Sequence, residues 1–223
     1  MTFQPEIVSG DPLFELIKRL VVEFKPKSIL EIGSANGLGS TQAFIAGITE
    51  AKIGKKCKLF CIESNPERFA DLEKNVAGLK FVNCINAFSV PVGKAMTDED
   101  IDDFMAINRG YNVHRLYSAE TVKDWLHAEL DMVERGAVLQ DGISQALSKN
   151  KGAFDMVLID GSAFTATAEL IELHGSPIVI MDDTLDIKCH EAMTLLSGDD
   201  AYCLIEEGRE YRNGYAAFKR AAR

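Results

Sequence analysis

The chain has few of the features that mark membrane, exported disulfide-rich or nucleic-acid-binding proteins. Its longest apolar runs, 156–159 and 178–181, are strand-sized and far shorter than the roughly 20 residues of a membrane-spanning helix. The five cysteines are scattered and odd in number, which favours reduced thiols over a disulfide framework or a zinc site. Basic residues are outnumbered 24 to 34, and the net charge of −10 repels phosphate backbones and anionic lipid. We therefore expect no nucleic acid and no membrane as partner, and a small molecule as substrate.

The start of the sequence also lacks the pattern of an export signal. Glu6 and Asp11 lie near the beginning, and no basic start is followed by an apolar stretch. We therefore expect a cytoplasmic protein. The length of 223 residues, with 47% hydrophobic and 26% charged residues, suits one globular domain over 1–223 with room for an insertion.

Short β-rich runs alternate with helical stretches, which is typical of a parallel sheet with helices on both faces. A first helix is expected over 12–24, because apolar residues recur at helical spacing after the capping candidate Asp11. The other predicted helices in this alternation are 40–49 and 66–76. The predicted strands are 28–32, 58–63, 81–85, 156–160, 178–181 and an antiparallel pair, 202–206 and 215–219. The predicted fold class is α/β, with a doubly wound, mostly parallel seven-stranded sheet.

The connection between the third and fourth predicted strands is much longer than a loop plus one helix. We therefore expect a helical insert or lid over about 90–150. Within it, 97–105 and 119–134 have helical character, and 140–148 supplies the crossover helix that returns to the sheet.

The most informative segment directly follows the first strand and reads Glu31-Ile32-Gly33-Ser34-Ala35-Asn36-Gly37-Leu38-Gly39. Glycines in such a turn permit positive φ and let the backbone approach a ligand closely. A dinucleotide fingerprint needs G-x-G-x-x-G, whereas this loop reads G-x-x-x-G-x-G with an acidic residue two places before the first glycine. The spacing therefore disfavours an NAD-dependent oxidoreductase.

This loop resembles the first motif of the class I S-adenosylmethionine (SAM)-dependent methyltransferases. The resemblance implies that the loop passes under the methionine part of SAM, and that Glu31 helps to hold its cationic amino acid end. Glu63 ends the next strand, where that family places the carboxylate that accepts both ribose hydroxyls. The resemblance also implies that the segment starting at Asn86, after the third strand, contacts the edge of the adenine ring. Asn86 stands where that family more commonly has an acidic residue. The residues assigned to the cofactor are Glu31, Gly33, Ser34, Ala35, Asn36, Gly37, Glu63, Ser64, Asn86, Ala87, Phe88 and Asp160.

Carboxylates gather at the predicted carboxyl ends of the fourth and fifth strands. Asp160 closes MVLID, and Asp182 and Asp183 close IVIMDD. Three such oxygen donors suit a hard divalent cation such as Mg²⁺, which would bind a substrate hydroxyl and lower its pKa. The alternative is that Asp160 and Asp182 cap following helices or line a solvated crevice.

This arrangement is similar to that of metal-dependent O-methyltransferases of the catechol and caffeoyl-coenzyme A type. Their ligands are an aspartate after strand four and an Asp-Asn pair after strand five, often continued by Thr-Leu. Asp182-Asp183-Thr184-Leu185 matches that run with Asp183 in the asparagine place, while a lysine found in some of those enzymes is absent from 161–164. The predicted metal ligands are Asp160, Asp182 and Asp183. The predicted catalytic residues are Asp160, Asp183 and His190, with the general base left open between His190 and metal activation alone.

Weaker sequence patterns bear on the identity of the molecule that accepts the methyl group. The segments IDGS-x-F, MDDT and RNGYA-x-FKR also resemble bacterial methyltransferases found with surface-polysaccharide pathways, which implies a glycan or nucleotide-sugar acceptor. Phe104, Tyr111, Tyr117 and Trp125 of the insert either form an apolar wall over the acceptor or pack the insert onto its own sheet edge.

We expect a SAM-dependent methyltransferase that O-methylates a small hydroxylated molecule or a sugar. The alternative is a regulatory module that binds SAM without turnover. The sequence leaves the oligomeric state open, with a homodimer as one option.

Overall fold

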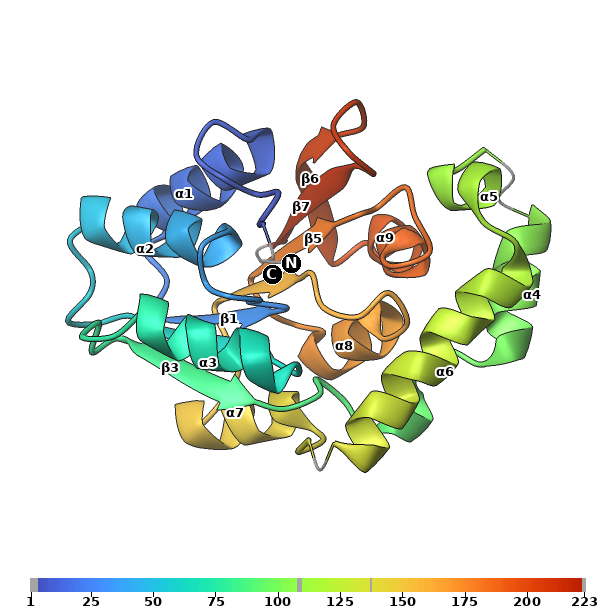
Figure 1. The fold of residues 1–223 in the computed structure, drawn as a ribbon. Coiled ribbons are helices and arrows are strands. Elements are labelled where there is room, and N and C mark those ends of the chain that lie inside the picture. Colours follow the sequence, from blue (N-terminus) through green and yellow to red (C-terminus); the bar gives the residue numbers. More distant parts are fainter. Residues whose placement is uncertain (1–3, 108–109, 137, 222–223) are drawn as a thin grey trace.

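A central seven-stranded sheet organises the chain, in the order β3-β2-β1-β4-β5-β7-β6 (Figure 1). The computed structural model describes residues 4–107, 110–136 and 138–221. The first five strands are parallel, and β7 runs antiparallel to both β5 and β6. The predicted fold class is therefore confirmed, including the antiparallel pair at the end. The strands are β1 Ser28–Ile32, β2 Lys58–Glu63, β3 Val82–Asn86, β4 Met156–Ile159, β5 Ile178–Asp182, β6 Tyr202–Gly208 and β7 Tyr215–Arg220.

Helices cover both faces of the sheet and bury a separate apolar core on each. One core contains residues of α1 (Pro12–Phe24), α2 (Ser40–Glu50) and α3 (Pro66–Asn75). The other contains residues of α7 (Gly142–Asn150), α8 (Ala166–Leu173) and α9 (His190–Ser197). Because β1 is buried on both sides, alternate residues contribute to opposite cores, Ile29 to the first and Leu30 to the second. This accounts for the continuous apolar runs in the sequence.

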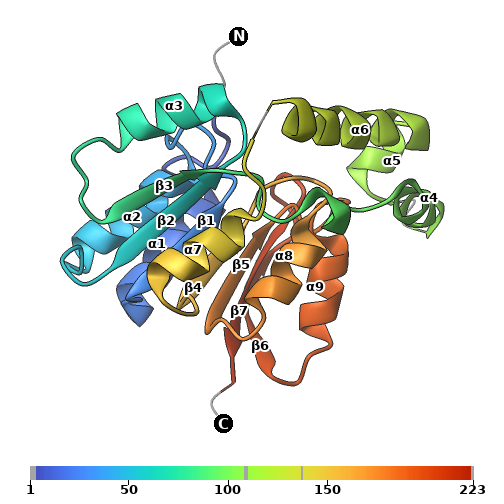
Figure 2. The same cartoon turned by 90° about the horizontal axis from the view of Figure 1, so that it is seen from below.

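The helical insert predicted between the third and fourth strands is present and packs around a small core of its own. It comprises the short 3₁₀ helix η1 (Val92–Lys94), α4 (Asp98–Ile107), α5 (Asn112–Leu116) and α6 (Ala119–Arg135). Figure 2 shows α4, α5 and α6 set beside α8 and α9. The insert core also includes Phe164, which follows β4, and Ile187, which follows β5. The insert is therefore packed against the two loops that end the central strands.

The predicted elements agree with the structure apart from their ends, the 3₁₀ helix η1 and three short α-helices. The third strand begins at Val82 rather than 81, and the fifth strand extends through Asp182. The sequence did not indicate α5, α8 or α9, whose lengths are 5, 8 and 8 residues. Helices this short show too few turns for a clear apolar periodicity. In the described residues, no helix is both long and apolar enough to cross a bilayer.

Gly47 lies where α1 and α2 approach each other, and it yields a test of the packing. A Cβ at this position would lie 2.7 Å from Cβ of Val21 and 3.0 Å from the carbonyl oxygen of Lys18. Gly47→Leu should therefore lower the free energy of unfolding by about 1–3 kcal/mol through overpacking. Gly93→Leu is the matched control, because a Cβ there meets no heavy atom within 4 Å. Urea unfolding of both variants measures the effect, and equal midpoints would contradict the prediction.

Candidate functional site

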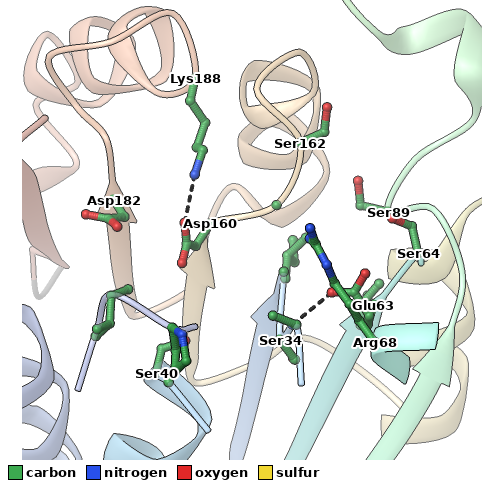
Figure 3. A pocket seen from close by; sticks show the side chains of 18 of the residues that line it. Ser34, Ser40, Glu63, Ser64, Arg68, Ser89, Asp160, Ser162, Asp182 and Lys188 are labelled. Atoms are coloured by element: carbon green, nitrogen blue, oxygen red, sulfur yellow. Dashed lines mark hydrogen bonds and ion pairs between the residues drawn. The ribbon is translucent and has the colours of Figure 1, made fainter. Parts of the chain in front are cut away.

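A cavity of about 370 Å³ opens at the carboxyl ends of the central strands (Figure 3). It lies beside β1 and β4, where the order of the sheet reverses, which is the usual ligand position in doubly wound folds. Its wall brings together ten of the residues predicted from sequence. These are Gly33, Ser34, Ala35, Glu63, Ser64, Ala87, Phe88, Asp160, Asp182 and Asp183.

The glycine-rich loop after β1 is fixed by its backbone. The N–H groups of Gly33 and Ser34 both donate to the carbonyl oxygen of Ile62, at 3.0 and 3.1 Å. Gly33 has φ of +86°, and a Cβ there would lie 2.1 Å from the carbonyl oxygen of Asp160. Only glycine combines this conformation with such a close approach. The loop therefore presents bare backbone to the cavity.

Glu31 lies behind the cavity wall, beneath this loop. Its side chain is fully buried and accepts hydrogen bonds from the hydroxyls of Ser34, Ser40 and Thr41, at 2.8, 2.6 and 2.7 Å. Burial raises the pKa of Glu31, and the three hydroxyls oppose that rise. Since Ser34 and Ser40 line the cavity, Glu31 sets the positions of two hydroxyls that a ligand would meet.

Glu63 ends β2 and keeps acceptor capacity toward the cavity. Its Oε2 accepts the N–H of Ala35 at 2.8 Å, and its Oε1 accepts the N–H of Asn65 at 2.7 Å. A carboxylate offers about four acceptor sites, so these two bonds do not use its full acceptor capacity. Burial raises the pKa of Glu63, while nearby N–H donors and Arg68 lower it. The side-chain amide of Asn86 donates to the carbonyl oxygen of Glu63 at 2.8 Å, which fixes the end of the strand.

Asn36 and Gly37, the remaining predicted cofactor residues, lie in the part of the loop that packs next to α3. The side chain of Asn36 accepts the N–H of Leu38 at 3.1 Å. A Cβ at Gly37 would lie 2.7 Å from Cδ1 of Leu72, so this glycine makes room for α3. Both residues therefore support the loop, and their contact with a cofactor stays a prediction.

His190 is placed at the junction between α9 and the insert. Its Nδ1 lies 2.9 Å from the hydroxyl of Tyr111, and its ring packs edge-on against Phe104. Burial lowers the pKa of His190, which favours the neutral ring. These contacts attach the insert to α9, and the catalytic role predicted for His190 stays a prediction.

The four aromatic residues of the insert lie away from the cavity wall, and none of the contacts below joins them to an edge of the sheet. Phe104 and Tyr111 belong to the core of the insert itself. Tyr117 and Trp125, both partly exposed, pack edge-on against each other with ring centroids 4.5 Å apart. Among the described residues, the cavity wall contains none of these four rings.

Asp160, Asp182 and Asp183 converge as predicted, with one oxygen of each within 4.8 Å of the others. Burial raises the pKa of Asp160 to about 6, against the opposing effect of Lys188. Burial and the two neighbouring aspartates raise the pKa of Asp182 to about 7. Asp160 and Asp182 therefore lie where a negative charge is costly without a nearby cation.

Two cationic side chains meet this aspartate cluster. Nζ of Lys188 lies 2.8 Å from Oδ1 of Asp160 and 2.7 Å from Oδ2 of Asp183 (Figure 3 shows the first contact). Nη2 of Arg212 lies 2.9 Å from Oδ1 of Asp182, and Nη1 of Arg212 pairs with Asp11. Burial alone would lower the pKa of Lys188, but the surrounding aspartates raise it well above its ordinary value. The aspartates therefore favour the charged form of the lysine.

The donor set of this cluster has the right chemistry for Mg²⁺, but the charges around it do not fit. Each of the three carboxylates is already paired with Lys188 or Arg212. A divalent ion among them would lie beside an ammonium group in a largely buried site, where like charges repel strongly. The predicted Mg²⁺ site stays a prediction that this pairing disfavours.

Several residues of the wall were not indicated by the sequence patterns. They are Ser40, Arg68, Ser89, Glu129, Ser162 and Lys188. Glu129 comes from α6 of the insert, and its Oε2 accepts a hydrogen bond from Ser162 Oγ at 2.9 Å. Burial raises the pKa of Glu129. Glu129 lies in no short sequence motif. It reaches the cavity only because of the path that the insert takes, which the sequence patterns do not indicate.

Comparison with known proteins finds matches in structure alone. No protein-family model matches the sequence, and no curated protein does. TomG, an O-methyltransferase from Streptomyces achromogenes involved in tomaymycin synthesis and solved with SAM, is 12% identical, with 97% of this chain and 83% of that chain covered and a TM-score of 0.57. The Bacillus cereus O-methyltransferase solved with SAH, the demethylated product, is 11% identical over 97% and 84%, with a TM-score of 0.56.

A third solved structure, a candidate caffeoyl-CoA O-methyltransferase from Staphylococcus aureus, is 17% identical over 97% of this chain and 87% of that chain, with a TM-score of 0.56. The chain has the class I methyltransferase fold. At such low sequence identities, the similarity shows the fold alone. That fold agrees with the strand order and the antiparallel final pair described above.

The three hydroxyl contacts of Glu31 give a stability prediction for the loop. Glu31→Ala would leave buried hydroxyls without their acceptor, at a cost of about 1–3 kcal/mol in the free energy of unfolding. Glu50→Ala is the control, because the side chain of Glu50 is largely exposed and its ion pair with Lys18 is a surface one. Chemical denaturation compares the two, and a loss for Glu31→Ala no larger than for the control would show that the network carries no stability.

Proposed function

We propose that this protein is a SAM-dependent methyltransferase that O-methylates a small hydroxylated molecule or a sugar. The observation that carries the proposal is the cavity, which joins a bare-backbone loop after β1 to an acceptor carboxylate at the end of β2. The fold of the compared O-methyltransferases supports it. The net charge of −10 favours a small acceptor over nucleic acid or a membrane surface, and the proposal places the protein in the cytoplasm.

In this proposal, SAM supplies an electrophilic methyl group on a sulfonium. The backbone around Gly33 and the hydroxyl of Ser34 hold its amino acid part, and Glu63 accepts hydrogen bonds from the ribose hydroxyls. Ala87 and Phe88 line the cavity after β3, where an adenine ring would lie against apolar atoms. The Ser89 hydroxyl donates to Glu169 at 2.5 Å, which leaves its oxygen lone pairs for a ligand N–H.

The acceptor then lies toward the ends of β4 and β5, beside the aspartate cluster. With SAM bound, the hydroxyl oxygen would take the methyl group, and the electron pair of the broken carbon–sulfur bond would stay on sulfur. The hydroxyl proton passes to the carboxylate of Asp183, which lines the cavity. The main contribution of the chain is to position the oxygen in line with the carbon–sulfur bond.

Cofactor binding tests the role of Glu63. Glu63→Gln removes the negative charge and one acceptor, and each hydrogen bond to a charged group contributes about 1.5–3 kcal/mol. SAM binding should therefore weaken by about 10- to 100-fold in calorimetry. Glu67→Gln, an exposed residue in the first turn of α3, is the control and should bind SAM like the wild type. Thermal unfolding confirms that the variant is folded, and unchanged affinity would remove Glu63 from the SAM site.

Turnover separates an enzyme from a regulatory module. The wild-type protein should bind SAM and SAH but not NAD, and should form SAH with a hydroxylated acceptor from a panel of phenols, catechols, sugars and nucleotide sugars. Mass spectrometry of the acceptor identifies the methylated product. Binding of SAM with no transfer to any member would favour the regulatory module. Absence of SAM binding at millimolar concentration would overturn the proposed function.

A further inference from the structure

Lys188 has no role in the sequence patterns, yet it occupies the centre of the aspartate cluster. It lies between β5 and α9, and its side chain is 16% exposed. Its ammonium group contacts Asp160 and Asp183, which come from the loops after two neighbouring strands. It therefore bridges the two carboxylates at the carboxyl ends of β4 and β5, as Figure 3 shows for the Asp160 side.

The backbone on both sides of Lys188 is anchored in apolar cores. Ile187 is buried in the core of the insert, and Cys189 is buried in the core beneath α8 and α9. Two buried neighbours on opposite sides leave the main chain at Lys188 little freedom to move away. The ammonium is therefore held in place by packing as well as by charge.

The charges of the cluster are partly compensated without any added ion. Three carboxylates face the cations of Lys188 and Arg212, and Arg212 is itself shared with Asp11. A divalent ion bound to the same oxygens would compete with both cations for them. It would also lie within a few ångströms of the ammonium nitrogen, in surroundings that screen charge poorly.

We propose that the Lys188 ammonium takes the place of a divalent metal ion in this cluster, so that the protein binds its acceptor beside a fixed side-chain cation and has no Mg²⁺ site. The inference deepens the proposed function and assigns the cation of that same site. A lysine can do this because its ammonium is a compact charge with three donors, and the two aspartate contacts leave donor capacity for an acceptor oxygen.

Metal titration tests this inference directly. Mg²⁺ and Mn²⁺ are titrated into the metal-free wild-type chain by calorimetry, and bound Mn²⁺ is counted by electron paramagnetic resonance. We expect the wild type to show no stoichiometric binding up to millimolar concentration. Lys188→Met removes the charge while keeping most of the side-chain volume, and it should bind Mn²⁺ at least 10-fold more tightly than the wild type.

Two further variants make the comparison specific to this ammonium. Lys188→Arg keeps the positive charge and should exclude the metal as the wild type does. Lys149→Met removes an exposed charge on α7, with the same change in net charge, and should leave metal binding unchanged. If Lys188→Met is unfolded by circular dichroism, Lys188→Gln replaces it in the same titration.

Stoichiometric Mg²⁺ binding by the wild type at or below millimolar concentration would overturn the inference. Failure of the folded neutral variants to bind Mn²⁺ would also overturn it, because the lysine would then fill no cation position. SAM affinity is measured in parallel with a chelator and with Mg²⁺, and the two values should agree within 2-fold. If SAM does not bind at all, the proposed function fails, while the metal titration still decides the nature of the cluster.

Discussion

The site depends on the close approach between the loop after β1 and the end of β4. These two strands are neighbours at the position where the order of the sheet reverses. Gly33 passes so near the carbonyl of Asp160 that a side chain has no room there. The approach places the glycine loop directly beside the aspartate cluster, and in the proposed function the first would face the cofactor and the second the acceptor. A bulkier residue at Gly33 would separate the two halves of the cavity.

Burial of acidic groups is the main electrostatic cost of this arrangement. Glu31, Glu63, Asp160 and Asp182 all lie where burial raises the pKa of the carboxyl. The chain offsets that cost in different ways. Glu31 is surrounded by hydroxyls and Glu63 by backbone N–H groups, whereas the aspartates meet cationic side chains. A buried polar group needs such partners, because an unpaired one would destabilise the fold.

Much of the fold could be predicted because its signals are local. The continuous apolar strand 28–32 and the capped helix after Asp11 are visible within a few residues, and the structure confirms both. The glycine spacing after β1 and the carboxylate at Glu63 could be found for the same reason. Both lie at the carboxyl ends of strands, and these ends meet at one edge of a parallel sheet.

The rest of the site could not be predicted, because it depends on where distant segments meet. Glu129 reaches the cavity only through the path of the insert. Lys188 is close to Asp183 in sequence, but its contact with Asp160 requires the neighbouring positions of β4 and β5. The convergence of the three aspartates was predicted correctly, while their pairing with Lys188 carries no local pattern. Glu31 was recognised by position, but its burial beneath Ser34 and Ser40 follows from tertiary packing.

The insert is attached to the rest of the chain at a few identifiable points. Tyr111 joins it to His190, Asn112 joins it to Asn213, and Glu129 joins it to Ser162. Its apolar core is largely separate from the two cores that support the sheet. Substitutions within α4–α6 can therefore remodel one rim of the cavity without disturbing the strands that form its floor. An exchange of this segment would therefore alter one rim of the cavity while the strand ends beneath it keep their positions.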